Sequence, residues 1–373
     1  MNRLLTAIVS SGLDVDEARL EQVLAEATAS RGWGFRMVTL LPDETPADVL
    51  RRAAAPTSEA SAVLVLPGEG VDLELEADSF STDQGRTRPP IIRFDLGARD
   101  RDPSTALLHH VRGLGLDGLP FVVNSAVAAA LHPARRVHYG PDAEQYGEWR
   151  EPVNAAGSGA PPLAVLIHGG FYRSRWQAGL MDELAVDVAR RGWRSWNLEY
   201  RRPDLHGWAA TLDDLRSGSA RARELAGPSG GPVVLVGHSA GGQLALQLAE
   251  EAAPETVQLT VSLAGVVDLV AAHERFLGEG AVGIALGGSP SEIPELYARA
   301  SPREFRERST PWLLVQGADD SADLVEMNRR LSRSVALGQP ELLEAPGHHF
   351  SVIDPRAPIW EATWARVLDL VEA

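Results

Sequence analysis

The chain alternates short apolar runs with amphipathic segments from its first residues onward. In the first third, apolar runs of strand length lie at 5–10, 35–40, 62–66 and 90–96. Segments with apolar residues at helical spacing lie at 14–31, 45–55 and 121–131. Strands that alternate with helices favour right-handed crossovers and a parallel sheet covered on both faces. We therefore expect residues 1–137 to form a small doubly wound, flavodoxin-like α/β domain.

The same alternation resumes after a break in the pattern. Between residues 132 and 162 the sequence carries Pro133, a turn-like run at 139–142 and a loop at 154–162 without a hydrophobic period. Predicted strands then lie at 163–167, 195–200, 232–236, 259–264 and 312–316, and predicted helices at 181–191, 212–226, 243–252 and 358–371. Pro358 suits the first position of the closing helix, where no backbone N–H is needed. We expect a second, larger α/β domain over residues 138–373.

Length and charge narrow the possible partners. The 373 residues suffice for two domains, since a domain takes roughly 100 to 200 residues. The formal net charge is −16, and such an acidic surface repels nucleic-acid phosphates and anionic lipid head groups. No apolar run reaches the roughly 18 residues of a membrane span. We expect no nucleic-acid partner, no membrane partner and a cytoplasmic location.

The chain contains neither cysteine nor lysine, which limits the chemistry it can carry. Cysteine nucleophiles, thiolate zinc sites, lysine Schiff bases and Walker phosphate loops are all excluded. The pair His109-His110 lacks carboxylate or cysteine companions at ligand spacing, so we expect no metal site. The run Gly113-Leu114-Gly115-Leu116-Asp117-Gly118 fits a dinucleotide loop, but the preceding 107–111 fits a helix end and no acidic residue follows about 20 positions later. We expect no cofactor.

The strongest local motif is a serine flanked by small residues. Gly237-His238-Ser239-Ala240-Gly241 directly follows the apolar run 233–236 and precedes a predicted helix. Small residues two positions before and after the serine permit a tight strand-to-helix turn that exposes its hydroxyl, and the helix N-terminus favours developing negative charge. Ser239 is therefore the candidate nucleophile.

A second motif lies upstream, at the end of the apolar run 164–167. His168-Gly169-Gly170-Phe171-Tyr172 leaves backbone N–H groups free to face an oxyanion. The N–H groups of Gly170, Phe171 and Ala240 can together form an oxyanion hole. We expect His168 to be architectural, and we consider Arg173 and Arg175 as contacts for a substrate carboxylate.

Candidate acids and bases follow the serine in chain order. The apolar run 312–316 leads to Asp319-Asp320, and His348-His349 lies further on, which matches the order Ser, Asp, His of hydrolases. A serine hydroxyl becomes a good nucleophile when an imidazole takes its proton, and a carboxylate orients that imidazole. We assign His349 as the base and Asp320 as the acid. His348 and Asp319 are the alternatives.

These motifs carry a resemblance to a known superfamily. Residues 138–373 resemble the α/β-hydrolases, and 168–172 with 237–242 look like the esterase, lipase and kynurenine formamidase (arylformamidase) branch. Asn197-Leu198-Glu199-Tyr200-Arg201-Arg202 is similar to a strand-end Tyr-Arg element of that branch. The family's spacing favours Asp320 and His349, although Ser321-Ala322-Asp323 stands where a Val-Pro segment is usual. The resemblance implies a serine hydrolase that cleaves a carboxylic ester or amide through an acyl-enzyme, without a cofactor.

The first domain resembles type II 3-dehydroquinate dehydratase in the runs 7–9, 62–68 and 90–96. The functional positions of that family do not carry over, because Ser10-Ser11-Gly12-Leu13 replaces its Asn-rich loop and Asp95 stands where it has a histidine. The resemblance implies a non-catalytic relative that serves packing, dimerisation or ligand binding. A homo-oligomer is thus a possible state of the protein.

The sequence defines a substrate class rather than one substrate. We expect a small uncharged or aromatic acyl ester, or an aryl formamide, under a cap built from residues 267–300, in which 276–291 is Gly-rich and unlike a core strand. The alternatives are peptidase or lactonase chemistry with the same triad, and a catalytically inactive hydrolase-fold binding module.

Overall fold

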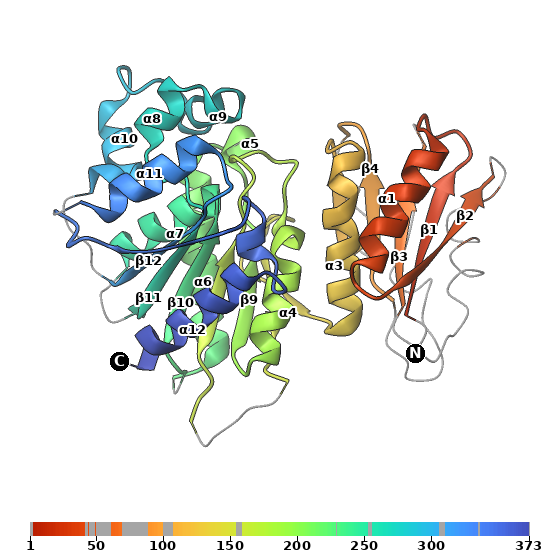
Figure 1. The fold of residues 1–373 in the computed structure, drawn as a ribbon, viewed down its shortest axis with the longest axis horizontal. Coiled ribbons are helices and arrows are strands. Elements are labelled where there is room, and N and C mark those ends of the chain that lie inside the picture. Colours follow the sequence, from red (N-terminus) through yellow and green to blue (C-terminus); the bar gives the residue numbers. More distant parts are fainter. Residues whose placement is uncertain are drawn as a thin grey trace. The chain divides into compact units, whose positions relative to one another are not determined.

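Figure 1 shows a computed structural model of the chain. It describes residues 3–41, 44, 49, 61–68, 89–99, 107–153, 159–228, 230–252, 256–305, 310–334 and 336–372. The chain divides into two compact units, Met1–Pro133 and Ala134–Ala373, and each is described by itself. The helix expected at 45–55 lies outside the described residues, apart from residue 49.

A five-stranded parallel sheet forms the centre of the first unit (Figure 1). Its strands are β1 (Leu4–Ser10), β2 (Gly34–Leu40), β3 (Ser61–Leu66), β4 (Ile91–Asp95) and β5 (His109–Arg112). The order β2-β1-β3-β4-β5 is the flavodoxin-like order of a doubly wound sheet. The predicted class of this part of the chain is therefore confirmed.

Two helices share one apolar layer with this sheet. They are α1 (Glu17–Ala29) and α3 (Leu119–Leu131), which contact each other. Leu20 and Leu24 of α1 and Val123 of α3 pack with the inward side chains of the strands. The helix α1 starts where the Asp16 carboxylate accepts a 3.1 Å hydrogen bond from the Arg19 N–H, which satisfies one of the free donors of the first turn.

The expectation of a helix end at 107–111 is wrong. Residues 109–111 of this segment belong to β5, which pairs with β4 so that His110 lies opposite Arg93. A run of four residues is too short for periodicity to distinguish strand from helix, so sheet pairing decides its conformation. The glycine pattern at 113–118 therefore follows a strand. Its last glycine serves packing, because a Cβ on Gly118 would overlap the Leu114 side chain.

An eight-stranded sheet forms the centre of the second unit, in the order β13-β12-β11-β10-β8-β9-β7-β6. The strands are β6 (Arg135–His138), β7 (Tyr146–Arg150), β8 (Leu163–Ile167), β9 (Arg194–Leu198), β10 (Val233–His238), β11 (Leu259–Leu263), β12 (Trp312–Gly317) and β13 (Glu341–Ala345). The pairs β6–β7 and β7–β9 are antiparallel, and all other pairs are parallel.

Helices cover both faces of this sheet (Figure 1). One apolar layer contains residues of α6 (Trp208–Ala226), α7 (Ala240–Glu251) and α11 (Ala322–Ser332). The other contains residues of α4 (Asp182–Arg190) and α12 (Pro358–Glu372), which begins at the predicted Pro358. Two layers of helices around a mainly parallel sheet confirm the predicted α/β-hydrolase fold.

Further helices lie between β11 and β12 and after β9. The segment expected to form a cap contains α8 (Leu269–Glu274), α9 (Leu277–Leu286) and α10 (Pro294–Ala300), which lie together in Figure 1. The short α5 (Pro203–His206) contacts α9. None of the helices in the described ranges combines the length and the apolar character that a membrane span requires.

The sequence patterns missed the strand β7 (Tyr146–Arg150) and its pairing with β6, although residues 137–139 are strand-like in sequence. The predicted boundary at residue 137 falls inside β6, in the segment that we expected to be a break in the pattern. The strand β7 lies between β6 and β9, with Trp149 opposite Trp196. Gly147 is required here, because a Cβ would overlap the Trp196 ring. This tertiary packing, which local periodicity does not show, makes the segment a strand.

Candidate active site

Ser239 lies in a sharp turn between β10 and α7. Its backbone has φ 55° and ψ −119°, a left-handed conformation that is uncommon for a residue with a side chain. The glycines on either side make the turn possible, since a Cβ on Gly237 would overlap the Gly241 carbonyl and one on Gly241 would overlap that of Ile167. The local sequence therefore holds this serine in a strained conformation between strand and helix.

Backbone hydrogen bonds fix this turn against the neighbouring strand. The Ser239 N–H donates to the Leu263 carbonyl at 2.8 Å, and the Ser239 carbonyl accepts from Gly242 at 2.9 Å and from Val266 at 3.2 Å. The residue is 2% exposed. Within the described part of the chain its hydroxyl makes no hydrogen bond, so its hydrogen-bonding capacity is unused.

The structure brings His349 and Asp320 together. The Nδ1 of His349 lies 2.8 Å from Oδ2 of Asp320, and Asp320 also accepts hydrogen bonds from Gln316 Nε2 at 3.0 Å and the Ser321 N–H at 2.6 Å. Burial alone would raise the pKa of Asp320, but the hydrogen bond from His349 and its other partners lower it below the ordinary value. A charged carboxylate thus faces Nδ1, which leaves Nε2 of His349 to exchange protons.

The alternative acid and base make backbone contacts instead. The Asp319 carboxylate accepts a 3.0 Å hydrogen bond from the Gly347 N–H, and its own N–H donates to the Gly347 carbonyl at 3.0 Å. His348 Nδ1 accepts from the Phe350 N–H at 3.2 Å. Both residues therefore shape the loop that carries His349.

Close backbone approach joins the strand before Asp320 to the loop before His349. A Cβ on Gly317 would overlap the Gly347 carbonyl, and Gly347 itself has φ 148°, in the region that favours glycine. The N–H of Ala318 donates to Ala345 at 2.8 Å. The spacing of the acid and the imidazole is therefore set by main chain.

The loop after β8 presents free backbone donors. Gly170, Phe171 and Tyr172 have φ of 116°, 48° and 61°. Within the described residues no hydrogen bond occupies the N–H groups of Gly170, Phe171 or Ala240. The loop lies against the serine, since a Cβ on Gly169 would come within 2.8 Å of Ser239 Cβ. Three unoccupied donors near a serine can stabilise an oxyanion.

Buried polar groups hold the loop after β8 in place. His168 is fully buried, with Nδ1 2.9 Å from the Gly169 carbonyl and its ring stacked on Tyr200 at 4.4 Å. The Tyr200 hydroxyl donates to the His168 carbonyl at 2.8 Å. The Glu199 carboxylate accepts from the Ala178 N–H at 2.8 Å and pairs with Arg202. These contacts agree with the architectural role expected of His168.

His238 is a site residue that the sequence reasoning missed. Its Nε2 lies 3.1 Å from the His349 carbonyl, to which it donates, and the two rings are 4.8 Å apart. Burial, followed by the positive charge that His349 can carry, lowers the pKa of His238 to about 3. The ring is therefore neutral near pH 7. Its position directly before the serine was the available signal.

Arg173 contacts the start of α9, within the segment that we expect to form a cap. Its Nη2 donates to the carbonyls of Gly278 and Glu279, both at 3.2 Å. Arg175, the other arginine that we considered as a carboxylate contact, is exposed. The two arginines are thus in different environments.

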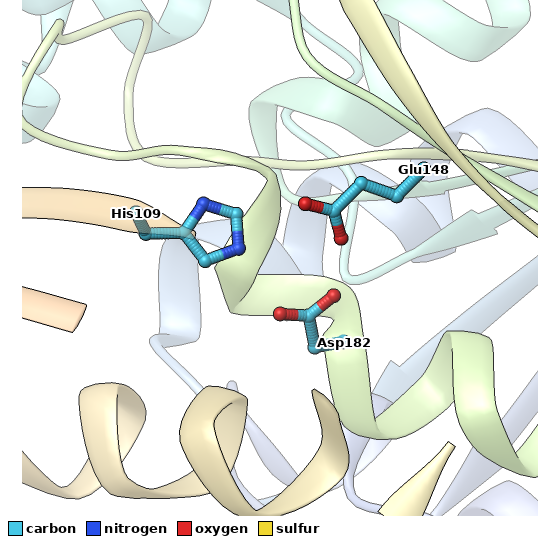
Figure 2. A group of neighbouring side chains, drawn as sticks. All are labelled: His109, Glu148 and Asp182. Carbon is cyan, nitrogen blue, oxygen red and sulfur yellow. The ribbon is translucent and has the colours of Figure 1, made fainter. Parts of the chain in front are cut away.

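Each unit also contains a cluster of charged side chains. In the second unit, Figure 2 shows the carboxylates of Glu148 and Asp182; the Arg150 Nη2 lies 3.6 Å from the former and 3.2 Å from the latter. His109, which the figure also labels, belongs to the first unit. There, Asp95 lies 2.6 Å from Arg93 Nε and 2.6 Å from His110 Nε2.

Part of the chain is similar to a known protein family and to solved esterase structures. The family model BD-FAE, which describes an α/β-hydrolase family, matches residues 152–334. Esterase B from Lactobacillus rhamnosis HN001 superposes with a TM-score of 0.52 at 19% identity, over 64% of this chain and 84% of that one. A bacterial heroin esterase gives 0.50 at 22% identity, over 64% and 83%. A search among curated proteins gave no match.

The family match and the fold agree with each other. The matched residues 152–334 include the loop after β8, the serine turn and Asp320, and they lie within the second unit. The solved structures share the fold of that unit. Hydrolase activity of the esterase kind is supported at the level of the family. The chain therefore contains an esterase-like α/β-hydrolase segment.

Proposed function

We propose that the protein hydrolyses carboxylic esters through a covalent acyl-enzyme on Ser239. The observation that carries the proposal is the strained Ser239 turn, with free N–H groups beside it and an imidazole–carboxylate pair on the neighbouring loops. In such an arrangement serine is the nucleophile, histidine is the general base and aspartate orients the histidine.

In the first half of the reaction the Ser239 hydroxyl attacks the ester carbonyl carbon. His349 Nε2 accepts the hydroxyl proton, and the Asp320 carboxylate stabilises the imidazolium through Nδ1–H. This transfer requires hydrogen-bond reach between Ser239 and His349, and such bonds often tighten only when substrate binds. His349 then donates the proton to the leaving alcohol, and the acyl group stays on Ser239.

In the second half water replaces the alcohol. His349 removes a proton from the water as it attacks the acyl-enzyme, and then returns a proton to Ser239 as the acid leaves. In both halves the negative charge on the carbonyl oxygen is stabilised by the N–H groups of Gly170, Phe171 and Ala240. Loss of one such donor typically costs about 10² to 10³ in kcat.

We propose small uncharged or aromatic acyl esters as substrates, with aryl formamides as the competing class. Aromatic rings near the proposed reacting groups support this choice, since the Phe350 ring lies 5.7 Å from that of His238 and 6.5 Å from that of Trp176. A structure similar to this chain, with a TM-score of 0.54 at 17% identity over 69% of this chain and 92% of that one, is esterase B inhibited by a tributyrin phosphonate.

Labelling with a fluorophosphonate tests the nucleophile. The wild-type protein is expected to take up one label, and Ser239→Ala none. Equal labelling of both proteins, or no labelling of the wild type, would contradict the proposal and favour an inactive binding module.

A substrate panel tests the class. p-Nitrophenyl esters of increasing acyl length are compared with N-formylkynurenine, and faster turnover of the esters is expected. Preference for the formamide would assign the site to the competing class. Labelling without turnover of either would direct attention to peptidase or lactonase chemistry.

A further inference from the structure

A left-handed turn lies within the cap, between α8 and the helical part of α9. Gly278, Glu279 and Gly280 have φ of 57°, 58° and 73° and ψ of 36°, 45° and 20°, and Phe276 before them has φ 53°. Glycine adopts this conformation freely, whereas a residue with a Cβ does so at a steric cost. Such a turn is retained only where its surroundings hold it in place.

Two residues of the loop that follows β8 hold this turn. We call this segment, residues 168–174, the oxyanion loop. Arg173 donates from Nη2 to the carbonyls of Gly278 and Glu279, and a guanidinium forms stronger hydrogen bonds than a neutral donor. The Phe171 ring packs on Gly278 so closely that a Cβ there would come within 2.7 Å of it. The turn is therefore fixed by charge-assisted hydrogen bonds and by close packing from the same loop.

The oxyanion loop is anchored on its other side as well. The Ser174 N–H donates to the Asp204 carboxylate at 2.8 Å, and Asp204 belongs to α5, which contacts α9. The Arg173 N–H donates to the Gly170 carbonyl at 3.0 Å, which closes the loop. The loop thus lies between α5 and the cap turn, with Arg173 as its charged contact to that turn.

We propose that Arg173 is a positioning residue that ties the cap to the oxyanion loop and thereby limits the size of the group beside the reacting carbonyl. The inference rests on the proposed function, in which the Phe171 N–H faces the oxyanion. The ring of the same residue supports the cap turn, so an outward shift of the turn frees space next to the reacting carbon. Release of Arg173 should therefore admit larger substrates.

Backbone amide hydrogen exchange tests, without any substrate, whether Arg173 ties the cap to the oxyanion loop. In Arg173→Ala we expect the amides of residues 276–286 to exchange faster, on the order of tenfold, because the turn loses the hydrogen bonds from Arg173. Arg175→Ala is the matched control, because Arg175 is exposed and has no side-chain hydrogen bond or ion pair among the described residues. Exchange that is unchanged in Arg173→Ala would overturn the proposal.

Steady-state kinetics test whether Arg173 limits the size of the substrate group beside the reacting carbonyl. kcat/KM is measured for a short and a long ester, with the acyl chain lengthened in one series and the alcohol in the other. Arg173→Ala should raise the long-to-short ratio in one series by about tenfold, and Arg173→Lys should raise it less, since an ammonium keeps the charge but lacks the forked donors. Arg175→Ala should leave the ratio unchanged.

The possible outcomes separate this inference from the proposed function. An equal fall in kcat/KM for all esters, with unchanged ratios, would mean a merely structural arginine and overturn the size limit. A wild-type protein without esterase activity would overturn the proposed function and the size limit together, whereas faster exchange in Arg173→Ala would still support the tie between cap and loop. If Arg173→Ala does not fold, the same measurements on Arg173→Lys decide.

Discussion

The two units present polar groups at the ends of parallel strands in different ways. In the second unit Ser239 follows β10 and Asp320 follows β12, and the described residues leave the serine hydroxyl and three nearby N–H groups without hydrogen bonds. In the first unit Asp95 ends β4, and it is already held by Arg93 and His110. Burial alone would raise the pKa of Asp95, but these two partners lower it.

The comparison distinguishes what a fold provides from what a reactive site additionally needs. Both sheets are doubly wound and place strand ends where such folds bind ligands. A reactive site additionally needs groups that their neighbours leave unsatisfied and aim at one point. The described residues bring together such groups around Ser239. In the first unit, the acid and the histidine contact each other.

The largest effect on kcat is expected when Ser239 of the second unit is replaced, and a serine of the first unit provides the comparison. Ser239→Ala should lower kcat by up to about 10⁶, by analogy with dissected triads. The matched control is Ser10→Ala, since Ser10 also ends a parallel strand, β1, and it should leave kcat unchanged. Initial rates with p-nitrophenyl acetate provide the measurement. A comparable loss in Ser10→Ala would remove the contrast between the units.

The next effect compares the adjacent aspartates. Asp320→Asn should lower kcat by about 10⁴, because the amide no longer favours the correct tautomer of His349. Asp319→Asn should cost much less, since its partner is the Gly347 N–H. Steady-state rates of both variants at one pH give the comparison. A larger loss in Asp319→Asn would reverse the assignment of the acid.

A smaller effect concerns stability and pH. The pKa of His238 is lowered to about 3 by burial, so below about pH 6.5 the unfolded chain binds a proton that the folded chain does not. Stability should therefore fall as the pH drops from about 6.5 to about 3, by up to about 1.4 kcal/mol per pH unit from this residue. His238→Gln keeps a donor for the His349 carbonyl and should flatten that slope.

Urea unfolding between pH 4 and pH 7 measures the slope. His348→Gln is the control, since that side chain is exposed, and it should retain the wild-type pH dependence. An unchanged slope in His238→Gln would mean that the imidazole titrates normally in the folded protein.

Removal of the first unit should have the smallest effect on the reaction at Ser239. We expect residues 1–133 to be catalytically silent, because the proposed site residues lie between Gly170 and His349. A chain that starts at Ala134 keeps β6 and both apolar layers of the second unit. Labelling of Ser239 should persist, whereas stability or oligomeric state should change. A truncated protein that is folded by circular dichroism yet unlabelled would show that the first unit completes the site.

The local motifs predicted most of the candidate site. Ser239, the glycine loop after β8 and the strands before them are encoded within short stretches, where small residues and apolar runs specify the turns directly. The pairing of His349 with Asp320 could be predicted because chain order in this fold sets which loops meet. The choice between adjacent aspartates followed from family spacing, and the contact geometry agrees with it.

Features that depend on distant contacts could not be predicted. The strand β7 is five residues long and fits its place because Gly147 leaves room for Trp196. The roles of His238 and Arg173 come from carbonyl groups far along the chain, at His349 and at Gly278. The hydrophobic periodicity of a sequence does not indicate such partners, because every residue has a backbone carbonyl.

The contact between Gly317 and Gly347 has a consequence for sequence divergence. Because the strand before the acid and the loop before the base meet main chain to main chain, this contact does not depend on the side chains that follow the acid. This explains how Ser321-Ala322-Asp323 can replace the usual Val-Pro segment while His349 and Asp320 stay 2.8 Å apart. Distant relatives should be recognised by these two glycines more readily than by the residues between them.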